Sequence, residues 1–284
     1  MKISKIVRLL PAIAIVVGPA LAPGHAETRT SLAPDAIIRP TATANSTQVK
    51  SFTRILSGNG WQTTIVLMDL GSTPLSFQQS FFGNSGTATP FTVQVGGGTS
   101  NLTTAALQGT VNANGSVSYT LPSTGSSLQE GWSLLTFTGA PNQLSGYAIL
   151  RHAATSGGFN FEVTLPLNNM QDYSARLPFD NTNGFQTQLT VVNPASNMAA
   201  QVHLTYFDAH GQTILLDSLA LNPGEQMTLV VPDTYPDLAG QSGTIAVLTN
   251  INTLSVAALR LNPLTGALTS APVMNFTGPV VALQ

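Results

Sequence analysis

Two stretches of this chain are nearly identical, and their repetition constrains the fold more than any other feature. Residues 59–69 read NGWQTTIVLMD and residues 183–193 read NGFQTQLTVVN, which places the two copies 124 positions apart. In both copies an Asn-Gly pair, a common turn dipeptide, precedes a run rich in β-branched and apolar residues. The repetition predicts a duplicated unit that begins with a turn and a β-strand.

Further pieces match in the same order along the two halves. The matched ranges are 118–122 with 228–232, 129–137 with 241–249, 147–151 with 256–260, and 165–167 with 271–273. Their offset shrinks to about 110, so the first half should carry an extra segment of roughly 15 residues, which we place around 90–105.

Short strand signals separated by turn residues fill both halves, and no helix is expected after the N-terminus. About seven strands in ~100 residues are typical of an immunoglobulin-like sandwich. We therefore predict an all-β fold of two tandem Ig-like antiparallel β-sandwich domains from an internal duplication. A single larger sandwich or barrel built from both halves is the structural alternative.

The ends of the chain complete the expected organisation. Residues 1–26 have a basic start, an apolar run and the sequence PGHA, which together indicate a signal peptide cleaved after Ala26. Residues 27–50 are rich in Thr, Ala, Pro and Ser and are expected to form a flexible leader. The predicted domains are then 51–173 and 174–284, with the boundary near Asp172–Pro178. A secreted, periplasmic or cell-surface location follows.

Charge and cysteine content exclude several classes of function. Charged residues make up 8% of the chain, against about a quarter in typical globular proteins. Without the signal peptide, seven Lys and Arg remain against twelve Asp and Glu, a balance of −5. We therefore expect no nucleic-acid partner and, after signal cleavage, no membrane insertion. The chain has no cysteine, which excludes disulfides and cysteine-based metal sites.

Three segments resemble known sequences: GNGWQTTIVLMDLGS, LPFDNTNGFQTQLTVVNPAS and LSVAALRLNPLTGALTSAPV. They are similar to segments such as "GGWQTTIVLVNP" and "LPFDNTNGF" in uncharacterised secreted proteins of acidobacterial-type soil bacteria. The resemblance covers roughly residues 52–275. It implies a two-repeat, β-rich exported module, and it supplies no catalytic residues.

Aromatic residues are the first candidates for a binding site. Trp61 and Phe185 follow the repeated Asn-Gly pairs and could stack on sugars, but a role as core residues at the start of each strand is favoured. Trp132 and Tyr147 are the aromatic residues we assign, as a hypothesis, to an exposed surface that stacks on carbohydrate.

Two arginines, Arg151 and Arg260, end matched strands and are the other candidate ligand-binding residues. A structural role is favoured, in which each guanidinium pairs with a carboxylate such as Asp69, Glu162 or Asp180, or with exposed carbonyls.

No cofactor and no metal site are predicted. DNTNG (180–184) resembles the start of a Ca²⁺ loop but lacks the rest of that signature. His152, His203 and His210 have no ligand spacing, and no serine lies in a G-x-S-x-G motif. LPSTG (121–125) matches a wall-sorting pattern but lies far from the C-terminus, so we interpret it as coincidence.

These observations predict a secreted, non-catalytic protein that serves as a structural or adhesive extracellular interaction module. Its partner would be an extracellular protein or a polysaccharide. A carbohydrate-binding module is the alternative, and a glycoside hydrolase with paired carboxylates is the third and weakest hypothesis.

Overall fold

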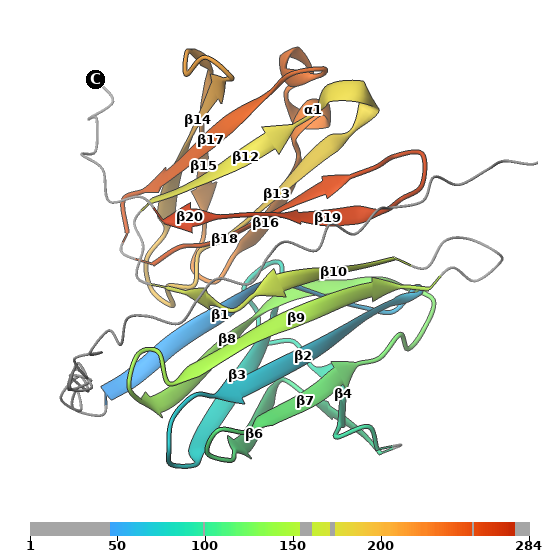
Figure 1. Cartoon of the computed structure of the whole chain (residues 1–284), viewed down its shortest axis with the longest axis vertical. Helices are drawn as coiled ribbons and strands as arrows, with labels where there is room; N and C mark the ends of the chain where they lie inside the picture. The colour runs from blue at the N-terminus through green and yellow to red at the C-terminus, as the bar shows by residue number, and fades with distance from the viewer. Residues whose placement is uncertain (1–45, 99, 154–160, 171–173, 252, 276–284) are drawn as a thin grey trace, which may run out of the picture. The chain divides into compact units, whose positions relative to one another are not determined.

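The computed structural model describes residues 46–98, 100–153, 161–170, 174–251 and 253–275, which all fall in one compact unit, Ala42–Gln284. The predicted signal peptide and residues 27–45 of the predicted leader lie outside these ranges. The described residues form antiparallel β-sheets, with one four-residue α-helix and two 3-10 turns (Figure 1). The prediction of an all-β fold is confirmed.

The first half forms two sheets that face each other. Sheet I has the order β11 (Asn168–Asn169), β1 (Ser46–Ser57), β8 (Gln129–Gly139), β3 (Leu75–Gly83) and β6 (Ala106–Val111). Sheet II has the order β10 (Phe161–Pro166), β9 (Leu144–His152), β2 (Trp61–Asp69), β7 (Ser116–Leu121), β4 (Phe91–Val95) and β5 (Asn101–Thr104). Alternate residues of both sheets meet in one core, which includes Phe52, Ile65, Phe81, Tyr119 and Leu135.

The second half is a second sandwich. Sheet III has the order β15 (Thr213–Leu221), β14 (Ala200–Asp208), β17 (Ser242–Thr249), β12 (Ser174–Asp180) and β20 (Met274–Asn275). Sheet IV has the order β16 (Gln226–Val230), β13 (Gln186–Val192), β18 (Ser255–Leu261) and β19 (Leu268–Ala271). The remaining elements are η1 (Thr182–Gly184), α1 (Val231–Thr234) and η2 (Pro236–Leu238). The core includes Leu177, Leu189, Tyr206, Ile245 and Val256.

The two sandwiches have the same strand order. Sheet I matches sheet III strand for strand, and sheet II matches sheet IV once β4 and β5 are set aside. The β4–β5 hairpin covers residues 91–104 and therefore lies in the extra segment expected around 90–105. A shared topology with one inserted hairpin is what a duplication would produce.

The strand pairing differs from the immunoglobulin order. In that order the first strand lies in the sheet of the second and fifth, and the seventh lies beside the third and sixth. Here β12, the first strand of its sandwich, pairs with the sixth (β17), and β18, the seventh, pairs with the second (β13). The alternation of apolar residues fixes which side chains point inward, but it does not specify which sheet a terminal strand joins.

The first strand begins inside the segment expected to be a flexible leader. β1 starts at Ser46, and Lys50 is only 7% exposed. Its ammonium group donates to the Leu144 carbonyl at 2.7 Å. Burial lowers the pKa of Lys50 below its ordinary value. The prediction of a leader is therefore wrong for residues 46–50.

The repeated Asn-Gly pairs form the same tight turn in both halves. Asn59 and Gly60 have φ of 49° and 82°, and Asn183 and Gly184 have φ of 55° and 77°. Turns of this kind need positive φ at both central residues, which Asn and Gly tolerate best. The turn returns the chain so that Trp61 N–H donates to the Gly58 carbonyl and Phe185 N–H donates to the Thr182 carbonyl.

The threonine of the repeated motif forms the same hydrogen bonds in both halves, which gives a structural reason for its recurrence after the turn. Thr63 Oγ1 accepts a hydrogen bond from Leu56 N–H at 2.8 Å and donates to the Leu56 carbonyl at 2.7 Å. Thr187 does the same with Asp180, at 2.9 and 3.3 Å. Both threonines are buried, so their hydroxyls satisfy backbone groups that water does not reach.

Replacing Thr63 or Thr187 with valine should lower the free energy of unfolding by about 1–3 kcal/mol, because a buried N–H and C=O lose their partner. Urea denaturation of each variant measures the loss. Thr64→Val is the control, since Thr64 is half-buried and its hydroxyl bonds the Thr120 hydroxyl, with no backbone partner among the described residues. Equal stability of Thr63→Val and Thr64→Val would contradict this role.

A third apolar cluster joins the two sandwiches. Leu56, Leu150, Val163 and Leu165 of the first pack against Ala257, Leu259 and Leu268 of the second. Buried polar bonds accompany the cluster: Gln226 Nε2 donates to the Thr53 carbonyl at 2.7 Å, and Ser51 bonds Ser255 at 2.7 Å. An apolar, hydrogen-bonded contact of this kind holds two domains in one arrangement.

Candidate functional site

Trp132 does not lie on an exposed surface, and its assignment to a stacking platform is wrong. The side chain is 1% exposed, stacks on Phe82 at 4.5 Å between ring centroids, and donates from Nε1 to the Gly224 carbonyl at 2.8 Å. It therefore fills the contact between the two sandwiches. Sequence alone gave no sign that the outer face of β8 is covered at this point.

Tyr147 and Arg151 lie on the outer face of sheet II. They are four residues apart along β9, and Ile149 lies midway between them. Tyr147 is half-buried and Arg151 is exposed. Arg151 stands opposite Gln62 on one side and Glu162 on the other. Trp132 belongs to sheet I, so the structure does not bring the predicted aromatic pair together.

Arg260 has the structural partner expected for it. Its guanidinium lies 2.7 Å from Asp180 Oδ2, and its Cζ lies 3.4 Å from the centroid of the Phe185 ring. Burial alone would raise the pKa of Asp180. The hydrogen bonds from Thr182 and the charge of Arg260 outweigh burial and leave that pKa below its ordinary value.

Arg151 and Arg260 do not occupy the same position in the two sandwiches. Arg151 faces Gln62, but Arg260 faces Thr187, which is the match of Thr63. The pairing is shifted by one residue, and in a strand such a shift moves a side chain to the other face of the sheet.

The aromatics of the repeated motif are half-buried and are not central core residues. Trp61 packs against His152 and Phe161, with ring centroids 4.9 and 5.5 Å apart. Phe185 lies under Arg260, as described above. Both rings therefore pack against neighbouring side chains.

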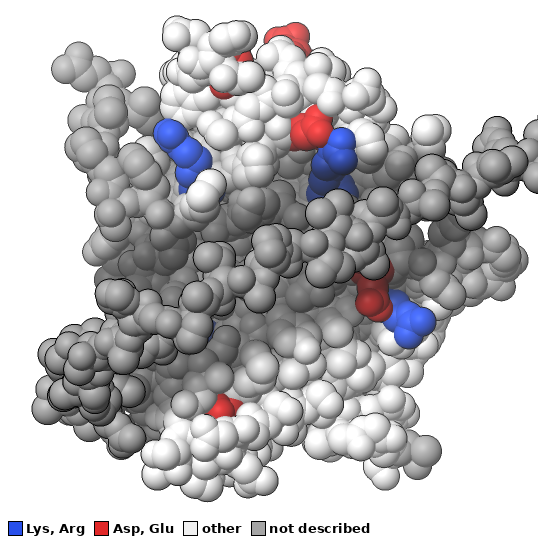
Figure 2. Space-filling model, viewed as in Figure 1, with Lys and Arg blue, Asp and Glu red and all other residues white. Residues whose placement is uncertain are grey.

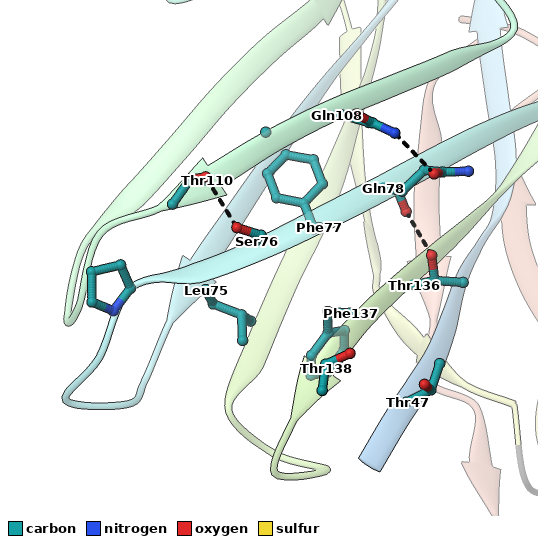
Figure 3. A pocket seen from close by; sticks show the side chains of 12 residues that line it. Thr47, Leu75, Ser76, Phe77, Gln78, Gln108, Thr110, Thr136, Phe137 and Thr138 are labelled. Carbon is teal, nitrogen blue, oxygen red and sulfur yellow. Dashed lines mark hydrogen bonds between the residues drawn. The ribbon is translucent and has the colours of Figure 1, made fainter. Parts of the chain in front are cut away.

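A shallow groove of about 780 Å³ lies on the outer face of sheet I (Figure 3). It runs across β1, β8, β3 and β6, and its lining contains no charged residue. The polar side chains of its lining are Thr47, Ser76, Gln78, Gln108, Thr110, Thr136 and Thr138.

The groove side chains are linked across the strands. Gln108 Nε2 donates to Gln78 Oε1 at 3.2 Å, and the Ser76 and Thr110 hydroxyls lie 3.3 Å apart (Figure 3). Thr136 Oγ1 lies 3.4 Å from the Gln78 carbonyl. These links hold hydroxyl and amide groups in a row that keeps further donors and acceptors free for a ligand.

The groove was not predicted from the sequence, although a signal for it exists. Ser76 and Gln78 alternate with the buried Leu75 and Phe77, and this pattern places them on the outer face of β3. What the pattern lacks is the order of the strands, because β6 and β8 flank β3 only once the sheet is built.

The acidic and histidine residues considered for catalysis or metal binding form separate local contacts. Asp69 Oδ1 accepts from Gly71 N–H, Glu130 pairs with Arg54 at 2.8 Å, and His203 Nδ1 bonds Ser218. Asp172 lies outside the described residues. In the described ranges no group of three or more His, Asp or Glu side chains lies close enough to hold a metal ion.

The DNTNG segment uses its oxygens internally. Asp180 Oδ1 accepts from the N–H and hydroxyl of Thr182, at 3.0 and 2.6 Å. Asn181 Oδ1 accepts from Thr187 N–H at 2.8 Å. The segment is a hydrogen-bonded turn that these contacts explain without a cation.

No protein-family model, curated protein or solved structure matches this chain. The geometry therefore carries the functional argument by itself. Separately, none of the helices among the described residues is both long enough and apolar enough to span a membrane.

Proposed function

We propose that the protein is an exported, non-catalytic interaction module with a structural or adhesive role, and that the groove on sheet I is its binding surface. The observation that carries the proposal is the chemistry of this groove. Its polar lining consists of hydroxyl and amide side chains, which suits a neutral partner rich in hydrogen-bonding groups.

The scaffold supports this role. The groove lies on β1, β8 and β3, and the same strands carry the contact with the second sandwich through residues such as Thr53, Trp132 and Phe82. A site built on packed strands keeps its geometry better than a site on loops. Figure 2 shows few charged side chains on the described surface of the face it displays, and red and blue groups touch in two places. The lining of the groove itself contains no charged residue, which agrees with a neutral partner.

A polysaccharide is the partner that this chemistry favours, which makes carbohydrate binding the second candidate function. Sugar hydroxyls donate and accept hydrogen bonds as Ser, Thr and Gln side chains do. The mode would differ from the stacking surface first considered, because the groove depends on hydrogen bonds and Trp132 is buried.

Binding should be detected by affinity electrophoresis through neutral glucans and should weaken about tenfold in Gln78→Ala. The Gln78 side-chain oxygen accepts from Gln108 across β3 and β6, and loss of one or two hydrogen bonds to the ligand of ~1 kcal/mol each gives this change. Gln94→Ala is the matched control, because Gln94 lies on sheet II and bonds Asn101.

The controls separate the hypotheses. Retention by neutral glucans that Gln78→Ala and Gln94→Ala reduce equally would remove the groove as the site. Retention only by an extracellular protein would favour adhesion to protein over carbohydrate binding. Release of soluble sugar from the glucan over time would contradict the non-catalytic proposal.

A further inference from the structure

The contact between the two sandwiches joins unlike surfaces. The first sandwich contributes Leu56 and Leu150 beside Val163 and Leu165, and the second contributes the outer side of sheet IV, with Ala257, Leu259 and Leu268 and the adjoining Leu261. Because the surfaces differ, this contact is heterologous, and each sandwich retains one surface that the contact does not use.

Strand register identifies the unused surface of the first sandwich. In the second sandwich, Leu261 of β18 lies opposite Gln186 of β13. At the corresponding place in the first sandwich, Arg151 of β9 lies opposite Gln62 of β2. Leu268 then stands opposite Leu261 as Glu162 stands opposite Arg151. Arg151 and Glu162 therefore hold, in the first sandwich, the places that the partly buried Leu261 and the buried Leu268 hold in the second.

The same comparison identifies the unused surface of the second sandwich. Arg260 stands opposite Thr187 as Leu150 stands opposite Thr63. Asp180 exchanges hydrogen bonds with Thr187 as Leu56 does with Thr63. Asp180 and Arg260 thus take the places of the leucines that the first sandwich buries.

We name these surfaces the face patch (Tyr147, Ile149, Arg151 and Glu162) and the side patch (Asp180, Arg260 and Thr269). Arg151, Glu162 and Thr269 are exposed, and the side chains of Arg260 and Asp180 are 36% and 33% exposed. The patches are accessible and correspond in strand register to the two halves of the internal contact, with charged residues where that contact has leucines.

The charges of the two patches suit each other. Each patch has one arginine and one carboxylate. Asp180 and Arg260 already pair at 2.7 Å within the side patch, so Glu162 and Arg151 can extend this pair into a network of four charges. No carboxylate among the described residues forms an ion pair with Arg151, which leaves its donors available. Arginine is enriched at protein interfaces, and Arg54, Arg151 and Arg260 all lie in the internal contact or in a patch.

We propose that a second copy of this chain docks its face patch on the side patch of the first, and so repeats the internal contact between molecules. The proposal goes beyond binding at the groove, because both patches lie outside sheet I. The rotation between successive sandwiches decides whether such a contact closes into a ring or continues as a filament.

Sedimentation of the mature chain at increasing concentration should show species larger than the monomer, and added salt should weaken their association. Arg151→Glu and Arg260→Glu should each weaken association about tenfold or more. Ser116→Glu is the control, because Ser116 is exposed on β7 and lies outside the face patch. This variant should associate like the parent chain. Thr269→Trp, at an exposed position, blocks the side patch if Arg260→Glu does not fold.

A mixture gives the decisive result. Arg151→Glu retains a working side patch and Arg260→Glu retains a working face patch, so the two variants together should form dimers that neither forms alone. A parent chain that stays monomeric at every concentration would overturn the proposal and would identify the charges as caps against association. Association unchanged by both variants would overturn it as well. Glucan retention in the same variants tests the groove separately.

Discussion

Trp132→Ala is expected to lower the free energy of unfolding by about 3–5 kcal/mol, the range for a fully buried large aromatic side chain. The indole is 1% exposed, so its removal leaves a cavity that rigid strands cannot fill. It also removes the stack on Phe82 and the only hydrogen bond described for the Trp132 side chain, to the Gly224 carbonyl.

The location of Trp132 adds a second expected effect. Trp132 belongs to the first sandwich and Gly224 to the second, so the variant loosens the coupling between them. Calorimetry should show one cooperative transition for the parent chain and a broadened or divided transition for Trp132→Ala.

Two variants serve as controls for this prediction. Trp132→Phe keeps an aromatic ring against Phe82 and loses the N–H donor, which should cost about 1–2 kcal/mol. Trp61→Ala removes a half-buried indole and should cost less than Trp132→Ala. A loss below about 1 kcal/mol in Trp132→Ala would mean that the indole is not part of the packed contact.

The sequence was sufficient to predict the elements and their repetition. Asn-Gly at 59–60 and 183–184 requires a turn, and the alternation in 61–69 requires a strand with one buried face. The shrinking offset between the halves located the extra residues, which form the β4–β5 hairpin. These features are local, and local chemistry determines them.

The strand order could not be predicted in the same way. Whether β12 pairs with β17 or with β13 depends on contacts between residues that are far apart in the chain. Its buried positions, such as Leu177 and Phe179, would fit the inner face of either sheet. The immunoglobulin-like expectation was therefore right about sandwiches of antiparallel strands. The described residues form eleven and nine strands where about seven were expected, and the first and seventh strands have other partners.

The candidate site shows the same limit at the level of side chains. Trp132 and Thr136 both point outward from β8, and nothing in the strand pattern distinguishes them. The second sandwich covers Trp132 and leaves Thr136 in the groove. Only the contact between the sandwiches decides which outward residue meets solvent.

Gly131 and Gly243 stand at matched positions of the two halves, and their surroundings lead to the second large expected effect. A Cβ atom at Gly131 would lie 2.0 Å from the Phe82 carbonyl oxygen, and one at Gly243 would lie 1.9 Å from that of Phe207. The blocking atom is backbone in both cases, so it can move only if β8 separates from β3, or β17 from β14. The two halves thus have the same close strand approach, which only glycine permits.

Gly131→Ala and Gly243→Ala should each lower the free energy of unfolding by about 3 kcal/mol, the upper part of the usual range for overpacking, because the strained atoms belong to paired strands. Urea denaturation measures both losses, and their similarity tests the equivalence of the two positions. Gly98→Ala is the matched control, since the nearest atom to its Cβ would be 3.3 Å away, and it should change stability by less than about 0.5 kcal/mol. Alanine tolerated at Gly243 but not at Gly131 would show that the second sandwich can open its β14–β17 pairing, and the two halves would then share a strand order without sharing its rigidity.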